Sequence, residues 1–262
     1  MPMPLPHDAS RLPTEVPPPG TAPEQRAALG WSLAVALVLP SVVTWVYFGL
    51  LHGSPPRLQQ AAYGLGKSLQ FALPAWVAWR GWGGSLEWLR PRTAGVVPGL
   101  WFGLAVCGCL VVAFRWLFAG QPVEQTLLAA AHAKVSSLGL SHPAAFLAVA
   151  LFYSAVHSLL EEYYWRWFVF GRGQAVWGWR AALVISSLGF MAHHVLLLGH
   201  FLGFAEWRTY LVAASVAIGG AVWAWLYHRT GNLTACWVSH ALVDAGIFGL
   251  GFWLLSRAGG PA

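Results

Sequence analysis

Three charged residues, two acidic and one basic, lie inside one long apolar segment of the chain, HSLLEEYYWRWFVF: Glu161, Glu162 and Arg166. Charged groups are costly in an apolar setting, so their presence here predicts a functional site. On a helix the two adjacent carboxylates point about 100° apart, which predicts different roles for them. Glu162 and Arg166 are four residues apart with the acid first, the favourable order for a helical ion pair. Glu161 is then the unpaired carboxylate, a group suited to act as a general base on water.

Two later apolar segments carry histidines at helical spacing. In SSLGFMAHHVLLLGH, Phe190 and His194 are four residues apart and share one face, whereas His193 points away from it. In SHALVD, His240 and Asp244 are also four apart, so Asp244 can lie beside the imidazole and fix its tautomer or orientation. Burying such groups costs least when they converge in the interior of one bundle, which predicts a single shared site.

Other polar residues in the same segments have a plainer interpretation. Histidines inside a membrane often only hydrogen-bond to a neighbouring helix, and this interpretation is favoured for His157, His193 and His200. His157 is the best exception among them, because it precedes Glu161 by one helical turn. Phe190 is likewise expected to pack against its neighbours rather than to take part in the chemistry.

Apolar helices must position these residues. Hydrophobic residues make up 57% of the chain and charged residues only 9%, against about a quarter charged in a soluble domain. Stretches of about 20 apolar residues suit membrane helices, and 262 residues leave room for about seven of them, with six to eight as the range. The predicted fold is therefore all-α, a polytopic transmembrane helix bundle. Its predicted spans are 28–51, 61–79, 94–118, 144–170, 180–201, 208–228 and 232–256.

Two further segments are not predicted to span the membrane. Residues 121–140 have helical periodicity, but their ionisable side chains favour an interfacial or loop helix over an eighth span: Glu124, His132 and Lys134. Residues 1–27 are rich in proline and almost free of aromatic residues, which predicts a disordered tail. The remainder, 28–262, is predicted to form one transmembrane domain with its catalytic core at about 144–250.

The distribution of basic residues predicts the orientation, because cytoplasmic loops hold the positive excess. With the N-terminus inside, the inner segments hold Arg11, Arg26, Arg80, Arg90, Arg92, Arg172, Arg180 and Arg229. The outer segments hold Arg57, Lys134, Arg208 and Arg257. A cytoplasmic N-terminus is therefore predicted. The net charge of +6 is spread over these loops, which suits a lipid bilayer as partner and gives no nucleic-acid footprint.

Taken together, the motifs resemble the CPBP family. This family comprises the CAAX prenyl endopeptidases of the Ras-converting type and their bacterial relatives, also called Abi proteins. EEYYWR is similar to the family's Glu-Glu-x-x-x-Arg motif, FMAHH to Phe-x-x-x-His and HALVD to His-x-x-x-Asn/Asp, in the same order. The resemblance covers about residues 144–250. It departs from the family's commoner pattern at Asp244, where Asn is frequent.

The resemblance implies an intramembrane endopeptidase that hydrolyses a peptide bond of a membrane-anchored protein or peptide. Position by position, Glu161 would activate the attacking water, while His194 and His240 would hold that water and stabilise the developing oxyanion. Asp244 would complete the catalytic cluster. The remaining motif residues would support the site: Glu162, Arg166 and Phe190.

A metal is the alternative to catalysis by glutamate alone. Glu161, His194 and His240 could fill three zinc positions and leave the fourth for water. However, the chain has no His-Glu-x-x-His helix, and a Glu161 that ligated zinc could not easily serve as a free base. Hydrolysis without a cofactor is therefore favoured, with zinc kept as the alternative.

The substrate and compartment follow only from the resemblance and the composition. Abundant Ala, Gly, Arg and Trp are typical of a GC-rich bacterial genome, which predicts the bacterial inner (cytoplasmic) membrane. Bacterial relatives are associated with bacteriocin maturation or self-immunity, and with removal of C-terminal sorting signals by enzymes that include the myxosortases. CAAX-like or sorting-signal processing is thus expected.

Two other classes of protein also bury such residues. A proton- or ion-coupled transporter uses buried Glu, His and Asp as relays, but it predicts matching halves, whereas these residues lie in the second half of the chain. A non-catalytic immunity or scaffold membrane protein is the third class. The oligomeric state stays open.

Overall fold

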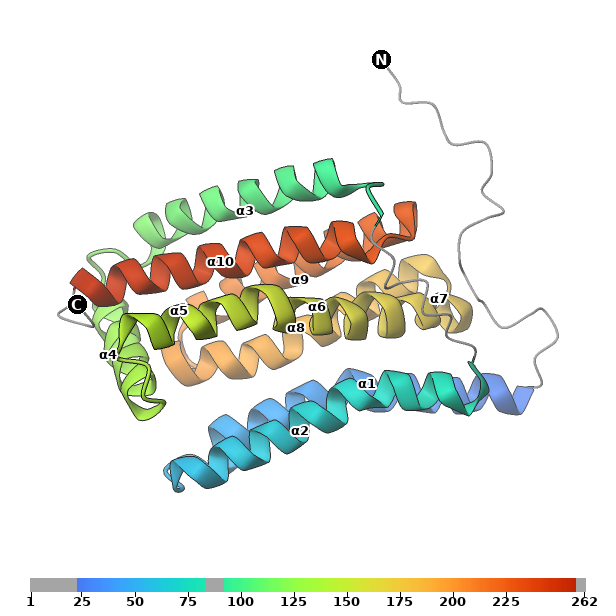
Figure 1. Cartoon of the computed structure of the whole chain (residues 1–262), viewed down its shortest axis with the longest axis horizontal. Helices are drawn as coiled ribbons and strands as arrows, with labels where there is room; N and C mark the ends of the chain where they lie inside the picture. Colours follow the sequence, from blue (N-terminus) through green and yellow to red (C-terminus); the bar gives the residue numbers. More distant parts are fainter. Residues whose placement is uncertain (1–22, 83–91, 258–262) are drawn as a thin grey trace, which may run out of the picture.

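A computed structural model describes residues 23–82 and 92–257, which form helices joined by short loops and contain no strand (Figure 1). This arrangement confirms the predicted all-α class. The predicted tail at 1–27 falls almost wholly outside the described residues, and the first helix already begins at Pro23. The helices are α1 (Pro23–Trp45), α2 (Pro56–Val77), α3 (Val96–Leu117), α4 (Pro122–Ser137), α5 (Pro143–Leu151), α6 (Ser158–Glu162), α7 (Gly171–Trp177), α8 (Trp179–Leu202), α9 (Trp207–Thr230) and α10 (Leu233–Arg257).

Six helical segments within the described residues are long and apolar enough to cross a membrane. They are Pro23–Leu50, Val96–Leu117, Pro143–Trp177, Trp179–Leu202, Trp207–Thr230 and Leu233–Ser256. This number confirms a polytopic bundle at the lower end of the predicted range.

The predicted span at 61–79 corresponds to α2, which is not among the six apolar segments. α2 has 22 residues, so its length is sufficient, but polar side chains lower its mean hydropathy: Gln59, Gln60, Lys67 and Gln70. The predicted interfacial or loop helix is α4, with 16 residues, which lies across one end of the bundle (Figure 1).

The helix that carries the two glutamates is continuous from Pro143 to Trp177, longer than the predicted 144–170. It ends before Gly178, whose φ of 77° leaves the helical region. Two π-helical segments, Phe152–His157 and Tyr163–Phe170, flank α6. Each wider turn changes which side chains share a face, and such segments are frequent at functional sites.

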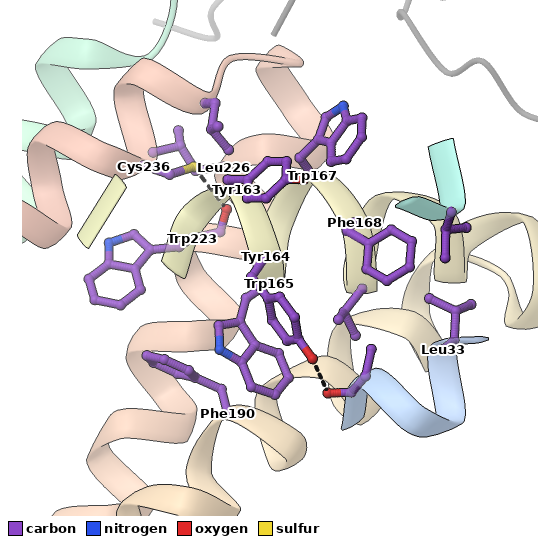
Figure 2. Packing of buried hydrophobic residues seen from close by; sticks show 14 of the residues in the cluster. Leu33, Tyr163, Tyr164, Trp165, Trp167, Phe168, Phe190, Trp223, Leu226 and Cys236 are labelled. Carbon is purple, nitrogen blue, oxygen red and sulfur yellow. Dashed lines mark hydrogen bonds between the residues drawn. The ribbon is translucent and has the colours of Figure 1, made fainter. Parts of the chain in front are cut away.

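The core of the bundle surrounds the π-helical segment Tyr163–Phe170, in which all eight residues are buried. A helix that is apolar all round belongs in the interior, and its aromatic rings meet side chains from α1, α8 and α9. Figure 2 shows Trp165 beside Phe190 of α8, with ring centroids 5.6 Å apart. Tyr164 donates a hydrogen bond of 2.7 Å to the carbonyl of Ala36 in α1. The core therefore fixes the glutamate-bearing helix from several sides.

α10 lies along α3, and α8 lies along α9 (Figure 1). The first pair approaches closely through two glycines spaced four apart. A Cβ added at Gly99 would lie 2.6 Å from the carbonyl oxygen of Ala235, and one at Gly103 would lie 2.9 Å from that of Ser239. Small residues at this spacing let membrane helices pack backbone to backbone. The contact at Ser239 also places its neighbour, His240.

Substituting Gly99 by Val is expected to lower the stability of the purified protein in detergent by about 1–3 kcal/mol, because the new side chain forces α3 away from α10. The same change at Gly108, on a face of α3 with nothing within 4 Å of a Cβ, is the matched control. Thermal unfolding measures both variants. Equal losses at the two positions would contradict the proposed close packing.

Candidate active site

Glu161 is buried, with 4% of its surface exposed, at the meeting point of three helices. Its Oε1 lies 3.8 Å from Nε2 of His157, one turn earlier, and 3.9 Å from Nε2 of His193 in α8. Its Oε2 lies 3.8 Å from Nε2 of His240 in α10. These separations exceed direct hydrogen-bond length, so three imidazoles surround the carboxylate without bonding to it. Glu161 and His240, which are far apart in the sequence, are thus brought together.

His240 is held by a carboxylate on each side. Its Nδ1 is 2.7 Å from Oε1 of the fully buried Glu162, a hydrogen bond in which the carboxylate accepts and Nδ1 carries the proton. Its Nε2 faces Glu161 and lies 3.6 Å from Oδ1 of Asp244. The residue that orients the ring through a hydrogen bond is therefore Glu162. Asp244, for which spacing predicted that role, lies on the same face but beyond hydrogen-bond length, with its side chain 18% exposed.

Arg166 neutralises Glu162 from the other side. Its Nε lies 3.2 Å from Oε2 of Glu162, which matches the ion pair predicted from their spacing. The guanidinium lies between two aromatic rings, 4.8 Å from the centroid of Phe190 and 4.9 Å from that of Trp223. Among residues 23–82 and 92–257, neither Nη atom of Arg166 has a hydrogen-bond partner, so the ring faces and the carboxylate stabilise the guanidinium. Phe190 thus serves as a packing partner for the arginine.

Trp223 of α9 belongs to the site but was missed by sequence reasoning. Its indole stacks on His240, with centroids 4.3 Å apart and an interplanar angle of 18°, and its Nε1 donates to Oγ of Ser239 at 3.0 Å. Cys236 also donates through its thiol to the Trp223 carbonyl at 3.3 Å (Figure 2). One tryptophan among 17 in an apolar chain carries no charge or spacing signal that would single it out.

Both histidines of the FMAHH segment face the site. Nδ1 of His194 is 2.8 Å from the carbonyl oxygen of Phe190. A carbonyl only accepts, so this nitrogen carries the proton and Nε2 is left for other partners. His194 is also close enough to Glu161 to interact with it electrostatically. The neighbouring His193, expected to point away, instead directs Nε2 toward Glu161 while its ring stacks on Trp165.

α2 contributes further side chains that the sequence analysis did not assign to the site. The ammonium of Lys67 lies over the rings of Tyr63 and Phe71, at 5.7 and 5.4 Å, and interacts electrostatically with Glu161. The Phe71 ring in turn contacts that of His157, with centroids 6.0 Å apart. A lysine inside a helical segment was a usable signal in the sequence, because such residues rarely lie in apolar helices without a role.

The zinc alternative named Glu161, His194 and His240 as ligands. Within 23–82 and 92–257, no group of three or more His, Cys, Asp or Glu side chains is arranged to hold a metal ion. Of the expected set, His240 already uses Nδ1 for Glu162, and its Nε2 is 3.8 Å from Glu161. No catalytic step is therefore derived through a metal.

Replacing Arg166 by Met is expected to destabilise the protein by about 3–5 kcal/mol, because Glu162 is left as an unpaired buried charge. In the double variant Glu162→Gln, Arg166→Met the loss should be clearly smaller than the sum of the single losses. Thermal unfolding in detergent measures this double-mutant cycle.

The more exposed pair Glu206 and Arg208, whose side chains approach to 2.8 Å, gives the matched control cycle. The coupling energy of this pair should be much smaller than that of Glu162 and Arg166, because solvent screens the charges. Additive losses at the buried pair would show that Arg166 does not compensate Glu162.

Comparison with protein-family models finds a match to the family described as Type II CAAX prenyl endopeptidase Rce1-like, over residues 143–246. The matched range begins at the first residue of α5, ends within α10 and includes all three motifs. No curated protein and no solved structure matches the chain. This match confirms the resemblance seen in the motifs: residues 143–246 are similar to the CAAX protease family of Rce1-like proteins.

Proposed function

We propose that this protein is a glutamate-dependent intramembrane endopeptidase that cleaves membrane-anchored proteins or peptides near their C-terminus. Family membership supports a CAAX-type protease in general. The catalytic role proposed for Glu161 rests on its environment. Its buried carboxylate lies 3.8–3.9 Å from the Nε2 atoms of three imidazoles. Polar groups separated by more than about 3.5 Å are suited to share a bridging water, the nucleophile that hydrolysis needs.

In the proposed reaction Glu161 takes a proton from water while the water oxygen attacks the carbonyl carbon of the scissile peptide bond. The new C–O bond turns the carbonyl oxygen into an oxyanion. Glu161 then returns the proton to the amide nitrogen as the C–N bond breaks, which releases one product with a new carboxylate and one with a new amine. The carboxylate ends the cycle ionised, as it began.

His194 and His240 have complementary tasks in this scheme. Both carry the Nδ1 proton, one facing a carbonyl and the other a carboxylate, so in the neutral state each Nε2 accepts a hydrogen bond from water. When protonated, each Nε2 donates to the oxyanion instead. Glu162 acts through His240, whose ring it orients, while Asp244 adds a second acceptor beside Nε2.

The depth of the site supports an apolar, membrane-anchored substrate. Glu161 lies sixteen residues before Trp177, about 24 Å along the helix, and His240 lies seven residues after Leu233, about 10 Å. A scissile bond must therefore enter the hydrocarbon layer to reach them. C-terminal CAAX-like tails or sorting signals are suitable clients, and the bacterial inner membrane with a cytoplasmic N-terminus is the proposed setting.

Glu161→Gln is expected to lower cleavage about 10²–10⁴-fold, because the amide cannot accept the proton from water. The measurement compares the membrane proteomes of cells that lack the native protein and carry either wild type or the variant, with C-terminal cleavage scored by mass spectrometry. Glu124→Gln in α4, far along the chain from the motifs, is the control at equal protein level. Equal processing by wild type and Glu161→Gln would remove Glu161 from the mechanism.

Removal of metals is expected to leave the activity of the purified protein unchanged, because the proposed steps use only side chains and water. Cleavage of a prenylated CAAX peptide would be measured before and after treatment with EDTA or 1,10-phenanthroline. Loss of activity that added zinc restores would overturn the metal-independent mechanism.

A further inference from the structure

Lys67 is a half-buried cation in the middle of α2, eleven residues after Pro56. Its ammonium lies over the rings of Tyr63 and Phe71 and forms no ion pair with a carboxylate among residues 23–82 and 92–257. A lysine held among aromatic rings without a direct ion pair is costly in a membrane protein, even within electrostatic range of Glu161. The cost indicates a role other than structural support.

The rings beneath Lys67 border the catalytic cluster. Phe71 contacts the imidazole of His157, which lies 3.8 Å from Glu161. Tyr63 hydrogen-bonds through its hydroxyl to Tyr153, whose ring is 4.7 Å from that of His157. Lys67 therefore faces the catalytic carboxylate from α2, within electrostatic range but beyond the 4.0 Å of an ion pair.

The internal anions of the site already have other partners. Glu162 is bonded to His240 and paired with Arg166, and Glu161 is surrounded by imidazoles. α2 also carries Gln70, three residues after Lys67, which is fully buried with neither side-chain polar atom hydrogen-bonded. Within the described residues, Lys67 therefore has no ion-pair partner and Gln70 no side-chain hydrogen bond, which favours a ligand for this part of α2.

We propose that Lys67 binds the C-terminal carboxylate of the substrate and so selects chains that end close to the scissile bond. The inference rests on the proposed function, because it takes the scissile carbonyl to lie beside Glu161. An extended chain advances about 3.3–3.6 Å per residue, so one to three residues separate the scissile bond from a carboxylate at Lys67.

A lipid phosphate is the other anion that a lysine could bind. Phosphates lie at the membrane surface, whereas Lys67 lies in the middle of α2, which packs along the apolar segment Pro23–Leu50, and is within electrostatic range of Glu161. The terminal carboxylate of a substrate reaches this depth together with the bond that is cut. The position of Lys67 therefore favours the substrate over the lipid.

The test uses two prenylated CAAX peptides that differ only at the C-terminus, one with a free carboxylate and one amidated. Purified full-length wild type is expected to cleave the amidated peptide at least about tenfold less efficiently, mainly through KM. The Lys67→Met variant should cleave the free-carboxylate peptide less efficiently by a similar factor, and should cleave the amidated peptide as efficiently as wild type does. Lys67→Arg should recover part of the lost efficiency.

Lys134→Met is the matched control, because Lys134 is the only other lysine in the chain and pairs with the hydroxyl of Tyr47. It should keep the wild-type preference for the free carboxylate. If Lys67→Met lowers the cleavage of both peptides equally, Lys67 acts only through its electrostatic effect on Glu161. A loss that varied with anionic lipid in the vesicles, and not with the peptide terminus, would assign Lys67 to a lipid phosphate. Either outcome overturns the proposal.

A binding measurement separates this inference from the proposed function. Fluorescent versions of the two peptides would be titrated into Glu161→Gln protein with and without Lys67→Met. Binding that is about tenfold tighter for the free carboxylate, and only when Lys67 is present, supports the role of Lys67 even if no cleavage is found. Equal binding of both peptides refutes that role while cleavage by wild type still stands.

Discussion

The rest of the structure depends on the buried carboxylate of Glu162, which is hydrogen-bonded to His240 and forms an ion pair with Arg166. This carboxylate is fully buried and reaches Nδ1 of His240 with one oxygen and Nε of Arg166 with the other. A buried charge without such partners would cost several kcal/mol, so the helix that carries Glu162 and α10 can pack here only in a register that satisfies it. The same bond aims Nε2 of His240 at Glu161 and so sets the geometry of the candidate active site.

Aromatic side chains extend this constraint to two more helices. Arg166 lies between Phe190 of α8 and Trp223 of α9, and Trp223 in turn covers the face of His240. Without a hydrophobic driving force between helices in lipid, close packing and polar contacts must supply the association. The buried ion pair and its aromatic neighbours provide both. Glycines of α3 complete the arrangement by letting that helix approach the backbone of α10 beside His240.

α2 differs from this tightly specified core. It packs mainly along α1 and carries polar residues that the described part of the protein does not pair, notably Lys67 and Gln70. A helix with unsatisfied polar groups is less favourable in lipid than one without them, and such groups are retained where a ligand uses them. The bundle thus combines a closely packed side that holds the candidate active site, formed by the second half of the chain, with a polar helix beside it.

The sequence by itself indicated the helical membrane class, the resemblance to a family and the motifs that carry it, because composition and helical spacing act locally. Apolar runs of about 20 residues can only be membrane helices, and Glu162 and Arg166 at four-residue spacing meet on any helix. The adjacent carboxylates of Glu161 and Glu162 also had to point in different directions, and they approach different nitrogens of His240.

Only the tertiary structure decided which partner each group meets. Glu162 rather than Asp244 binds Nδ1 of His240, and His193 turns toward Glu161, because π-helical turns and helix packing set directions that an ideal α-helix does not. Trp223 and Lys67 join the site through contacts between helices distant in sequence. Such contacts leave no periodic signal along the chain, since they depend on how whole helices cross rather than on the spacing within any one of them.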